Sequence, residues 1–321
     1  MKSVLWMRAC NHESGQETPR VKPFVYNYNG LPCYEQSLCQ ALNADSGRVE
    51  IRQFPDGETY LRVLDTQVPA TAIVLADLHA PDAKFLPLAF LAECLRELGA
   101  KTIILVTPYL PYMRQDIRFH PGEGITSRYF AKLVSGLFDG LVTLDPHLHR
   151  YHSLDEIYGI PSRVAHADDL VAEWIATHVP APVIVGPDEE SEQWAGETAM
   201  RVGCPAMVLR KTRLGDREVQ IDIPDLEQHR GRTPVLVDDI IATGHTMLET
   251  AQHLLDAGMP PPVCVGIHGI FADQAFNELQ QGPIGRIVTG NSIPHATNGI
   301  ALEAVVAAAA ADLLEALRER G

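Results

Sequence analysis

The sequence predicts an α/β protein with two similar halves, each a mostly parallel sheet flanked by helices. Short aliphatic and β-branched runs recur along the chain, and stretches with helical periodicity separate them. Such alternation is typical of parallel sheets, because the crossover between two parallel strands needs a helix-length segment. Two sets of these elements meet around Tyr158–His166, which indicates two halves.

The predicted elements follow each other in a regular order. The predicted strands are Ala72–Ala76, Thr102–Val106, Leu141–Leu144, Val183–Gly186, Ala206–Leu209, Val235–Val237, Val263–Ile267 and Arg286–Thr289. The predicted helices are Phe85–Leu98, Thr126–Leu137, Asp168–Thr177, Ser191–Val202, Thr246–Ala257 and Asp273–Gln280. We expect an extension over residues 1–23, a first domain over 24–160 completed by a helix over 303–321, and a second domain over 161–302.

Composition excludes several classes of protein. The 321 residues include 26 Lys and Arg against 41 Asp and Glu, a formal net charge of −15, which disfavours a nucleic-acid partner. No apolar run approaches the ~18 residues of a transmembrane helix, and the first residues are too polar for a secretory signal. Six scattered cysteines without CxxC spacing indicate reduced thiols. We therefore expect a cytoplasmic protein without a membrane partner.

The segment Val235–Thr246, VLVDDIIATGHT, carries the clearest chemical signal. An apolar strand leads into two adjacent acids, and a Thr-Gly-His-Thr turn then opens a helix. Amides at a helix start, the positive end of the helix dipole and the hydroxyls of Thr243 and Thr246 favour a phosphate. Asp238 and Asp239 suit vicinal ribose hydroxyls or a bridging Mg²⁺ instead. The segment therefore predicts a site for a ribose 5-phosphate group.

This segment closely resembles the phosphoribosyl-pyrophosphate (PRPP) motif of type I phosphoribosyltransferases and of PRPP synthetases. Further segments favour the synthetases, the ribose-phosphate pyrophosphokinases, over a stretch from about Phe24 to about Ala311. In chain order these segments are Gln53–Glu58, Thr107–Asp116, Leu144–His147, Gly186–Asp188, Leu209–Arg213 and His268–Phe271. A phosphoribosyltransferase has no reason to carry the first three. The resemblance implies that both domains have the phosphoribosyltransferase-like fold, the first on the ATP side and the second on the ribose 5-phosphate side.

The resemblance also implies a set of site residues. For ATP these are Phe54, Asp56, Glu58, Arg114, Gln115 and His147. For ribose 5-phosphate they are Asp238, Asp239, Thr243, Gly244, His245 and Thr246. His147 and Asp188 would organise Mg²⁺, the expected cofactor. Lys211 and Arg213 would be catalytic: they alternate, so on an extended segment both point to one face, where two cations could stabilise a pyrophosphoryl group in transit.

The implied reaction converts ATP and ribose 5-phosphate into PRPP and AMP. In the family the ATP site lies across a dimer, so we expect a homodimer or larger homo-oligomer.

Three departures from the family pattern keep other functions open. Ala242 stands where many synthetases have Asp, His245 replaces a common Gly and would strain the turn if φ were positive there, and Glu189-Glu190 replace glycines. The loop over residues 118–128 is closer to archaeal-type members. The alternatives are a phosphoribosyltransferase, a kinase for another sugar phosphate and a non-catalytic synthetase-like subunit.

Overall fold

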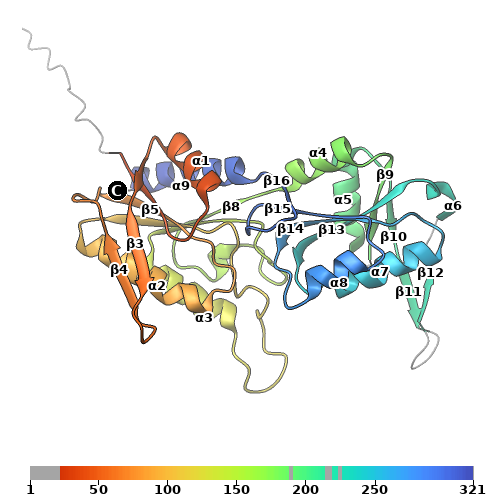
Figure 1. Cartoon of the computed structure of the whole chain (residues 1–321), viewed down its shortest axis with the longest axis horizontal. Coiled ribbons are helices and arrows are strands. Elements are labelled where there is room, and N and C mark those ends of the chain that lie inside the picture. The colour runs from red at the N-terminus through yellow and green to blue at the C-terminus, as the bar shows by residue number, and fades with distance from the viewer. Residues whose placement is uncertain (1–21, 188–190, 214–218, 223–225, 321) are drawn as a thin grey trace, which may run out of the picture.

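The computed structural model describes residues 22–187, 191–213, 219–222 and 226–320. It contains two six-stranded sheets, which lie side by side along the long axis of the molecule (Figure 1). All neighbouring strands within each of these two sheets run parallel. The prediction of an α/β fold with two similar halves is therefore confirmed.

The first sheet has the order β2-β1-β5-β6-β7-β8. Its strands are β1 (Phe24–Asn27), β2 (Asp45–Gly47), β5 (Thr71–Leu75), β6 (Thr102–Val106), β7 (Gly140–Leu144) and β8 (Ser162–Ala165). Its helices are α1 (Pro32–Leu42), α2 (Asp82–Glu97), α3 (Thr126–Leu137) and the C-terminal α9 (Glu303–Arg320), and the 3₁₀ turn Leu154–Glu156 precedes β8. Since β8 pairs with β7, this sheet continues past residue 160, where the sequence places the domain boundary.

The second sheet has the equivalent order β10-β9-β13-β14-β15-β16. Its strands are β9 (Pro182–Gly186), β10 (Ala206–Val208), β13 (Thr233–Ile241), β14 (Val263–Gly269), β15 (Arg286–Gly290) and β16 (Asn298–Ile300). Its helices are α4 (Asp168–His178), α5 (Glu192–Val202), α6 (Leu226–His229), α7 (His245–Asp256) and α8 (Ala275–Gln281). In this matching order β13 is the counterpart of β5, and β9 is the counterpart of β1.

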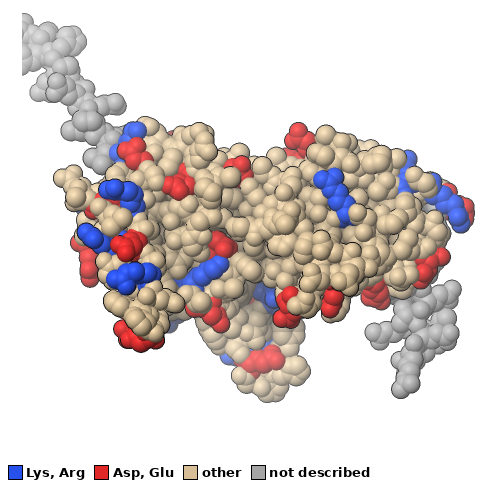
Figure 2. Space-filling view, viewed as in Figure 1, with Lys and Arg blue, Asp and Glu red and all other residues tan. Residues whose placement is uncertain are grey.

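Two antiparallel hairpins complete the described chain. They are β3–β4 (Val49–Gln53 and Thr59–Val63) and β11–β12 (Arg210–Arg213 and Val219–Asp222). Figure 1 shows them at opposite ends of the molecule, and Figure 2 shows acidic and basic side chains interspersed over the face in view. No described helix is both long enough and apolar enough to span a bilayer.

One hydrophobic core joins the two halves. Residues of α1, α9, α4 and α5 pack over one face of both sheets in a single cluster, whereas the opposite faces are covered separately by α2 and α3 and by α7 and α8 (Figure 1). Helix α9 packs against α1, β7 and β8, so the end of the chain returns to the first half. We propose on this basis that α9 completes the first domain and that the second domain begins after Ala165.

Candidate functional site

The acidic pair lies on β13, at the end of the strand that faces the boundary between the halves. Strand β13 continues through both acids to Ile241, and it stays paired to β14 at Asp238–Gly266 and Ile241–Gly269. The sheet therefore holds the backbone of this pair rigidly. In parallel α/β sheets the carboxyl ends of the strands are where ligands bind, and most often at the point where the strand order reverses. For the second sheet that point lies between β9 and β13.

A tight turn joins β13 to α7. Gly244 has φ +70°, and a Cβ there would lie 2.8 Å from a methyl carbon of Leu279 on α8, so glycine is needed on both counts. His245 is the first residue of α7 and is exposed. The positive φ thus falls on Gly244, and the strain that a His at position 245 could have introduced does not arise.

The first turn of α7 is suited to an anion. Its first intrahelical bond runs from the amide of Leu248 to the carbonyl of Gly244 at 2.9 Å, so the preceding amides have no partner inside the helix. The side chains of Thr243, His245 and Thr246 are exposed around this turn. The turn can therefore present backbone donors, two hydroxyls and an imidazole to a phosphate.

His147 reaches the acidic pair from the first half. It lies in the loop after β7, and its Nδ1 is 2.6 Å from Oδ2 of Asp239. The ring of His149 stacks on it with centroids 6.1 Å apart and an interplanar angle of 10°. The hydrogen bond to Asp239 raises the pKa of His147, against the opposing effect of its partial burial. The structure thus brings together, across 92 residues of sequence, a residue predicted for ATP and Mg²⁺ and a residue predicted for ribose 5-phosphate.

The two carboxylates are electrostatically unequal. Burial, and then the negative charge of Asp239, raise the pKa of Asp238. Burial also acts to raise the pKa of Asp239, but the hydrogen bond and charge of His147 outweigh it and lower that pKa. The pair therefore carries negative charge that its own surroundings compensate only in part, which favours a ligand rich in hydroxyl donors or a cation.

A cavity of about 670 Å³ opens at this junction. Its volume is within the range of small-molecule sites, roughly 300–1,000 Å³. The walls come from both halves: His147, Leu148, His149, Asp168, Pro187, Ser191, Trp194, Thr198, Val237, Asp238, Asp239, Thr246 and Ile267. Asp168, Trp194 and Thr198 were not predicted as site residues. Asp168 is the first residue of α4, which follows β8, and Trp194 and Thr198 lie on α5, which follows β9. The only sequence signal for them was their place after predicted strands, at the carboxyl edge of the sheets where ligands bind.

The predicted ATP residues divide into two groups. Arg114 is exposed and lies close enough to His147 to oppose its protonation, so it borders the site. Phe54, Asp56 and Glu58 are exposed on the turn of the β3–β4 hairpin, which Figure 1 places in the opposite half from β13 and α7. These three residues do not line the cavity of their own chain.

Four further predicted site residues are not among the described residues that line the cavity. Gln115 is partly buried, and its carbonyl accepts from the amide of Ser127 at 3.3 Å. Asp188 lies outside the described residues. Lys211 and Arg213 lie on β11, which is extended as expected, but their side chains are outside the described part of the structure. Within the described residues, no three or more His, Cys, Asp and Glu side chains converge in a way that could hold a metal ion.

Comparison with known protein families agrees with this geometry. Residues 153–302 match the family model described as phosphoribosyl transferase domain, and residues 24–137 match the N-terminal domain of ribose phosphate pyrophosphokinase. The class of protein is thus a two-domain phosphoribosyl-binding α/β enzyme.

Relatives of known function identify the family. A ribose-phosphate pyrophosphokinase of Methanopyrus kandleri is 33% identical over 279 residues, 86% of this chain and 94% of the relative, and one of Sulfolobus acidocaldarius is 30% identical over 84% of this chain and 92% of the relative. A phosphoribosylpyrophosphate synthetase structure from Mycobacterium smegmatis has the same fold, with a TM-score of 0.76 at 22% identity over 94% of this chain and all of that one. The chain belongs to the ribose-phosphate pyrophosphokinase family, which confirms the predicted family and the predicted enzyme class.

Proposed function

We propose that the chain transfers the β,γ-pyrophosphoryl group of ATP to the C1 hydroxyl of ribose 5-phosphate, giving PRPP and AMP. The observation that carries this proposal is the meeting of an anion-binding turn, an acidic strand end and His147 at one cavity that both halves build. The reaction needs an acceptor and a donor held in line, and a cavity between two domains can bind one from each side.

The acceptor fits the second half. The turn Thr243–Thr246 would bind the 5-phosphate through the amides at the start of α7 and through its side chains. Asp238 and Asp239 would accept hydrogen bonds from the vicinal ribose hydroxyls. The sugar would then lie across the end of β13, with its C1 hydroxyl directed into the cavity.

The cofactor that we propose is Mg²⁺. Mg²⁺ needs only one or two protein carboxylates when substrate phosphates supply its other ligands, and the adjacent Asp238 and Asp239 fit that requirement. The raised pKa of Asp238 marks a site where a cation would be favourable. His147, Asp188 and the acidic pair would hold it together with the phosphates of the nucleotide. When bound, Mg²⁺ would neutralise part of the charge on the transferring group.

The donor site would be shared between two copies of the chain. Because Phe54, Asp56 and Glu58 lie far from the cavity of their own chain, we propose that the β3–β4 hairpin of a second subunit supplies them (Figure 1). The chain has an apolar surface that could pair with such a copy: Leu86 and Phe90 of α2 and Tyr129 and Leu133 of α3 are each at least 45% exposed. Arg114, Gln115 and His147 would complete the ATP site, and we expect a cytoplasmic homodimer or larger homo-oligomer.

One assay tests the reaction. The purified chain is incubated with ATP, Mg²⁺ and ribose 5-phosphate, and AMP and PRPP are quantified by chromatography; we expect both in equal amounts. Absence of AMP, with PRPP consumed in a second incubation that supplies PRPP and a nucleobase, would identify a phosphoribosyltransferase. AMP formed with another sugar phosphate but not with ribose 5-phosphate would identify a different acceptor.

A matched pair of variants tests the catalytic assignment. Lys211→Ala should lower turnover by about 10²-fold or more, because a cation on the transferring group acts mainly in the transition state. Lys101→Ala, at an exposed lysine of the first half, should leave turnover unchanged. Equal turnover in the two variants would exclude the proposed role of Lys211.

A further inference from the structure

His268 is a buried histidine of the second half that contacts the first half. It lies near the end of β14 with 1% of its surface exposed. Its Nε2 is 3.2 Å from the carbonyl oxygen of Asp145, and its Nδ1 is 2.8 Å from Oγ of Ser292. A carbonyl can only accept, so Nε2 carries the proton and donates to Asp145. Ser292, whose Oγ lies beside Nδ1, is itself held by a hydrogen bond that its hydroxyl donates to the carbonyl of Ile267 at 3.0 Å. Burial lowers the pKa of His268 to about 4, which is consistent with this neutral form.

The residue that accepts this bond is held at every polar group of its main chain and side chain. The amide of Asp145 donates to the carbonyl of Ala165 at 3.0 Å. Its carboxylate accepts from the amide of Ala167 and pairs with Nδ1 of His166, both at 2.8 Å. Asp145 has φ +32°, a conformation that a non-glycine residue keeps only where its surroundings over-determine it. All these partners except His268 come from the end of β8 and the two residues after it.

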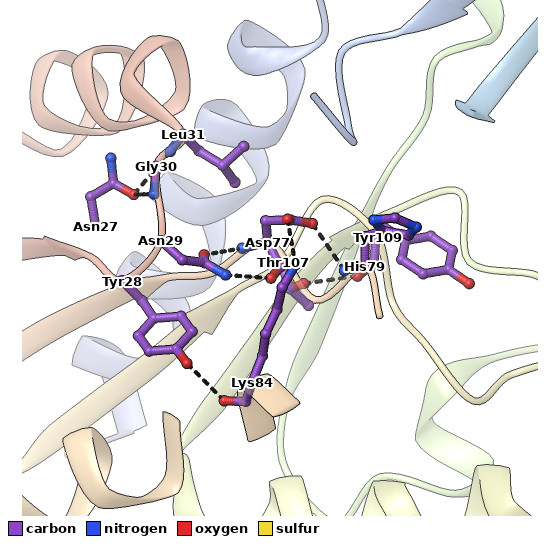
Figure 3. A network of polar contacts seen from close by, with 10 residues as sticks. All are labelled: Asn27, Tyr28, Asn29, Gly30, Leu31, Asp77, His79, Lys84, Thr107 and Tyr109. Atoms are coloured by element: carbon purple, nitrogen blue, oxygen red, sulfur yellow. Dashed lines mark hydrogen bonds and ion pairs between the residues drawn. The ribbon is translucent and has the colours of Figure 1, made fainter. Parts of the chain in front are cut away.

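A tyrosine of the first half also contacts the His268 ring. The ring of Tyr109 meets it edge to face, with centroids 5.2 Å apart. The Thr107 hydroxyl, itself fully buried, donates to the carbonyl of Tyr109 at 2.8 Å. Figure 3 shows the Tyr109 ring pointing away from the polar network around Asp77. A stiff turn of the first half thus packs against the histidine that reaches over from the second.

We propose that His268 is a positioning residue that sets the place of His147 relative to Asp239. Asp145 lies two residues before His147, and the donated hydrogen bond from His268 ties its carbonyl to the strand next to β13. His147 must reach Asp239 across the boundary to within 2.6 Å, and a displacement of about 1 Å is enough to disturb a reacting geometry. The contact of His268 with Asp145 therefore fixes the part of the site that neither half can fix alone.

The kinetics of three variants test this role, and this kinetic test rests on the proposed function. His268→Phe keeps an aromatic ring but removes the donor, and His268→Gln places an amide donor near the position of Nε2. Val288→Ala, the control, shortens a buried side chain on the adjacent strand β15 and leaves His268 and Asp145 in place. His268→Phe should lower kcat about tenfold or more while the KM for ribose 5-phosphate stays within about twofold, because the acceptor site lies wholly in the second half. His268→Gln should recover most of kcat, and Val288→Ala should lose Tm but not kcat. A kcat for His268→Phe equal to that of Val288→Ala would overturn the proposal.

Hydrogen exchange tests the same role without turnover. The amides of Asp145, His147, Leu148 and His149 should exchange about tenfold faster in His268→Phe than in the wild-type chain, and at the wild-type rate in Val288→Ala. Unchanged exchange in His268→Phe would overturn the positioning role even if the enzyme is active. If the wild-type chain forms no AMP, the proposed reaction fails, and the exchange result alone then decides the role of His268.

Discussion

The two halves have the same strand order, yet the points where that order reverses are built in opposite ways. In the first half this point lies between β1 and β5, and polar groups of the chain itself fill it (Figure 3). The carboxylate of Asp77, just after β5, accepts from Nζ of Lys84 at 2.7 Å and from the amide of His79 at 2.9 Å. The side chain of Asn29 exchanges two hydrogen bonds, of 2.6 and 2.7 Å, with the backbone of Asp77. The polar groups of Asp77 thus find their partners within the first half.

The equivalent point of the second half faces the cavity. Asp238 and Asp239 occupy the end of β13, and His147 reaches one of them from the other half. Where the first half has a lysine at the start of the following helix, the second half has the Gly244 turn and the amides of α7. The fold therefore supplies the same location twice, and the side chains decide whether it is sealed as structure or left charged for a ligand.

The largest expected difference between the two points is in activity. Asp239→Asn should lower AMP and PRPP formation by about 10²-fold or more, because the amide cannot replace the charge that faces His147 and the acceptor. Asp77→Asn should keep kcat and lower the free energy of unfolding instead, since the carboxylate there serves Lys84. Turnover and urea unfolding of both variants would measure this. If Asp77→Asn loses as much activity as Asp239→Asn, the first point is not merely structural.

For the second half, the chemistry of this strand end could be predicted from the sequence. The acidic pair, the Gly244 turn and the helix that follows are contiguous in the chain, so their chemistry can be inferred from spacing. All eight predicted strands are present, because buried parallel strands form continuous aliphatic runs. The strands missed are shorter or half-exposed, as in β2 and the β3–β4 hairpin, and lack such a run.

The rest of the site depends on contacts between distant segments. The distance between the β3–β4 hairpin and the cavity could not be predicted, because a motif gives the residues and not the subunit that uses them. The bond from His268 to Asp145 spans 123 residues, and neither residue has a local pattern that indicates its partner. The internal lysine of the first half was missed for the same reason: Lys84 resembles any helix lysine until β5 places Asp77 beside it.

The next expected effect is the stability supplied by that lysine. Lys84→Met should lower the free energy of unfolding by about 2 kcal/mol, because it leaves the Asp77 carboxylate, which is 12% exposed, without its cation. Fully buried pairs cost more than this when one partner is removed and surface pairs cost less, and this pair is intermediate. Urea unfolding measures the change. Lys132→Met, at an exposed lysine of α3, is the control and should be neutral.

The double variant sharpens the interpretation of this loss. Asp77→Asn combined with Lys84→Met removes both charges, so part of the loss should be recovered relative to Lys84→Met alone. Equal losses of unfolding free energy in Lys84→Met and in the Lys132→Met control would mean that the Asp77–Lys84 ion pair does not stabilise the first half. In that event the backbone bonds of Asn29 would carry the network.

The smallest expected effect is a pH-dependent gain in stability when Asp238, at the end of β13, is replaced by Asn. The folded state raises the pKa of Asp238 above its ordinary value, through burial and the charge of Asp239. A carboxyl with a raised folded-state pKa stabilises the fold most below its unfolded pKa, and that contribution is lost as pH rises through the folded pKa. Asp238→Asn should therefore raise Tm by about 2 °C at pH 8, and this gain should disappear near pH 4.

The counterpart in the first half should respond with the opposite sign. Asp77 has its charge compensated by Lys84, so Asp77→Asn should lower Tm at pH 8, where Asp238→Asn raises it. Adding Mg²⁺ should reduce the gain in Asp238→Asn, because a cation that binds the wild-type pair stabilises the wild-type fold by mass action. A loss of Tm in Asp238→Asn at pH 8 would show that the pair is compensated within the chain, and the two points would then be alike.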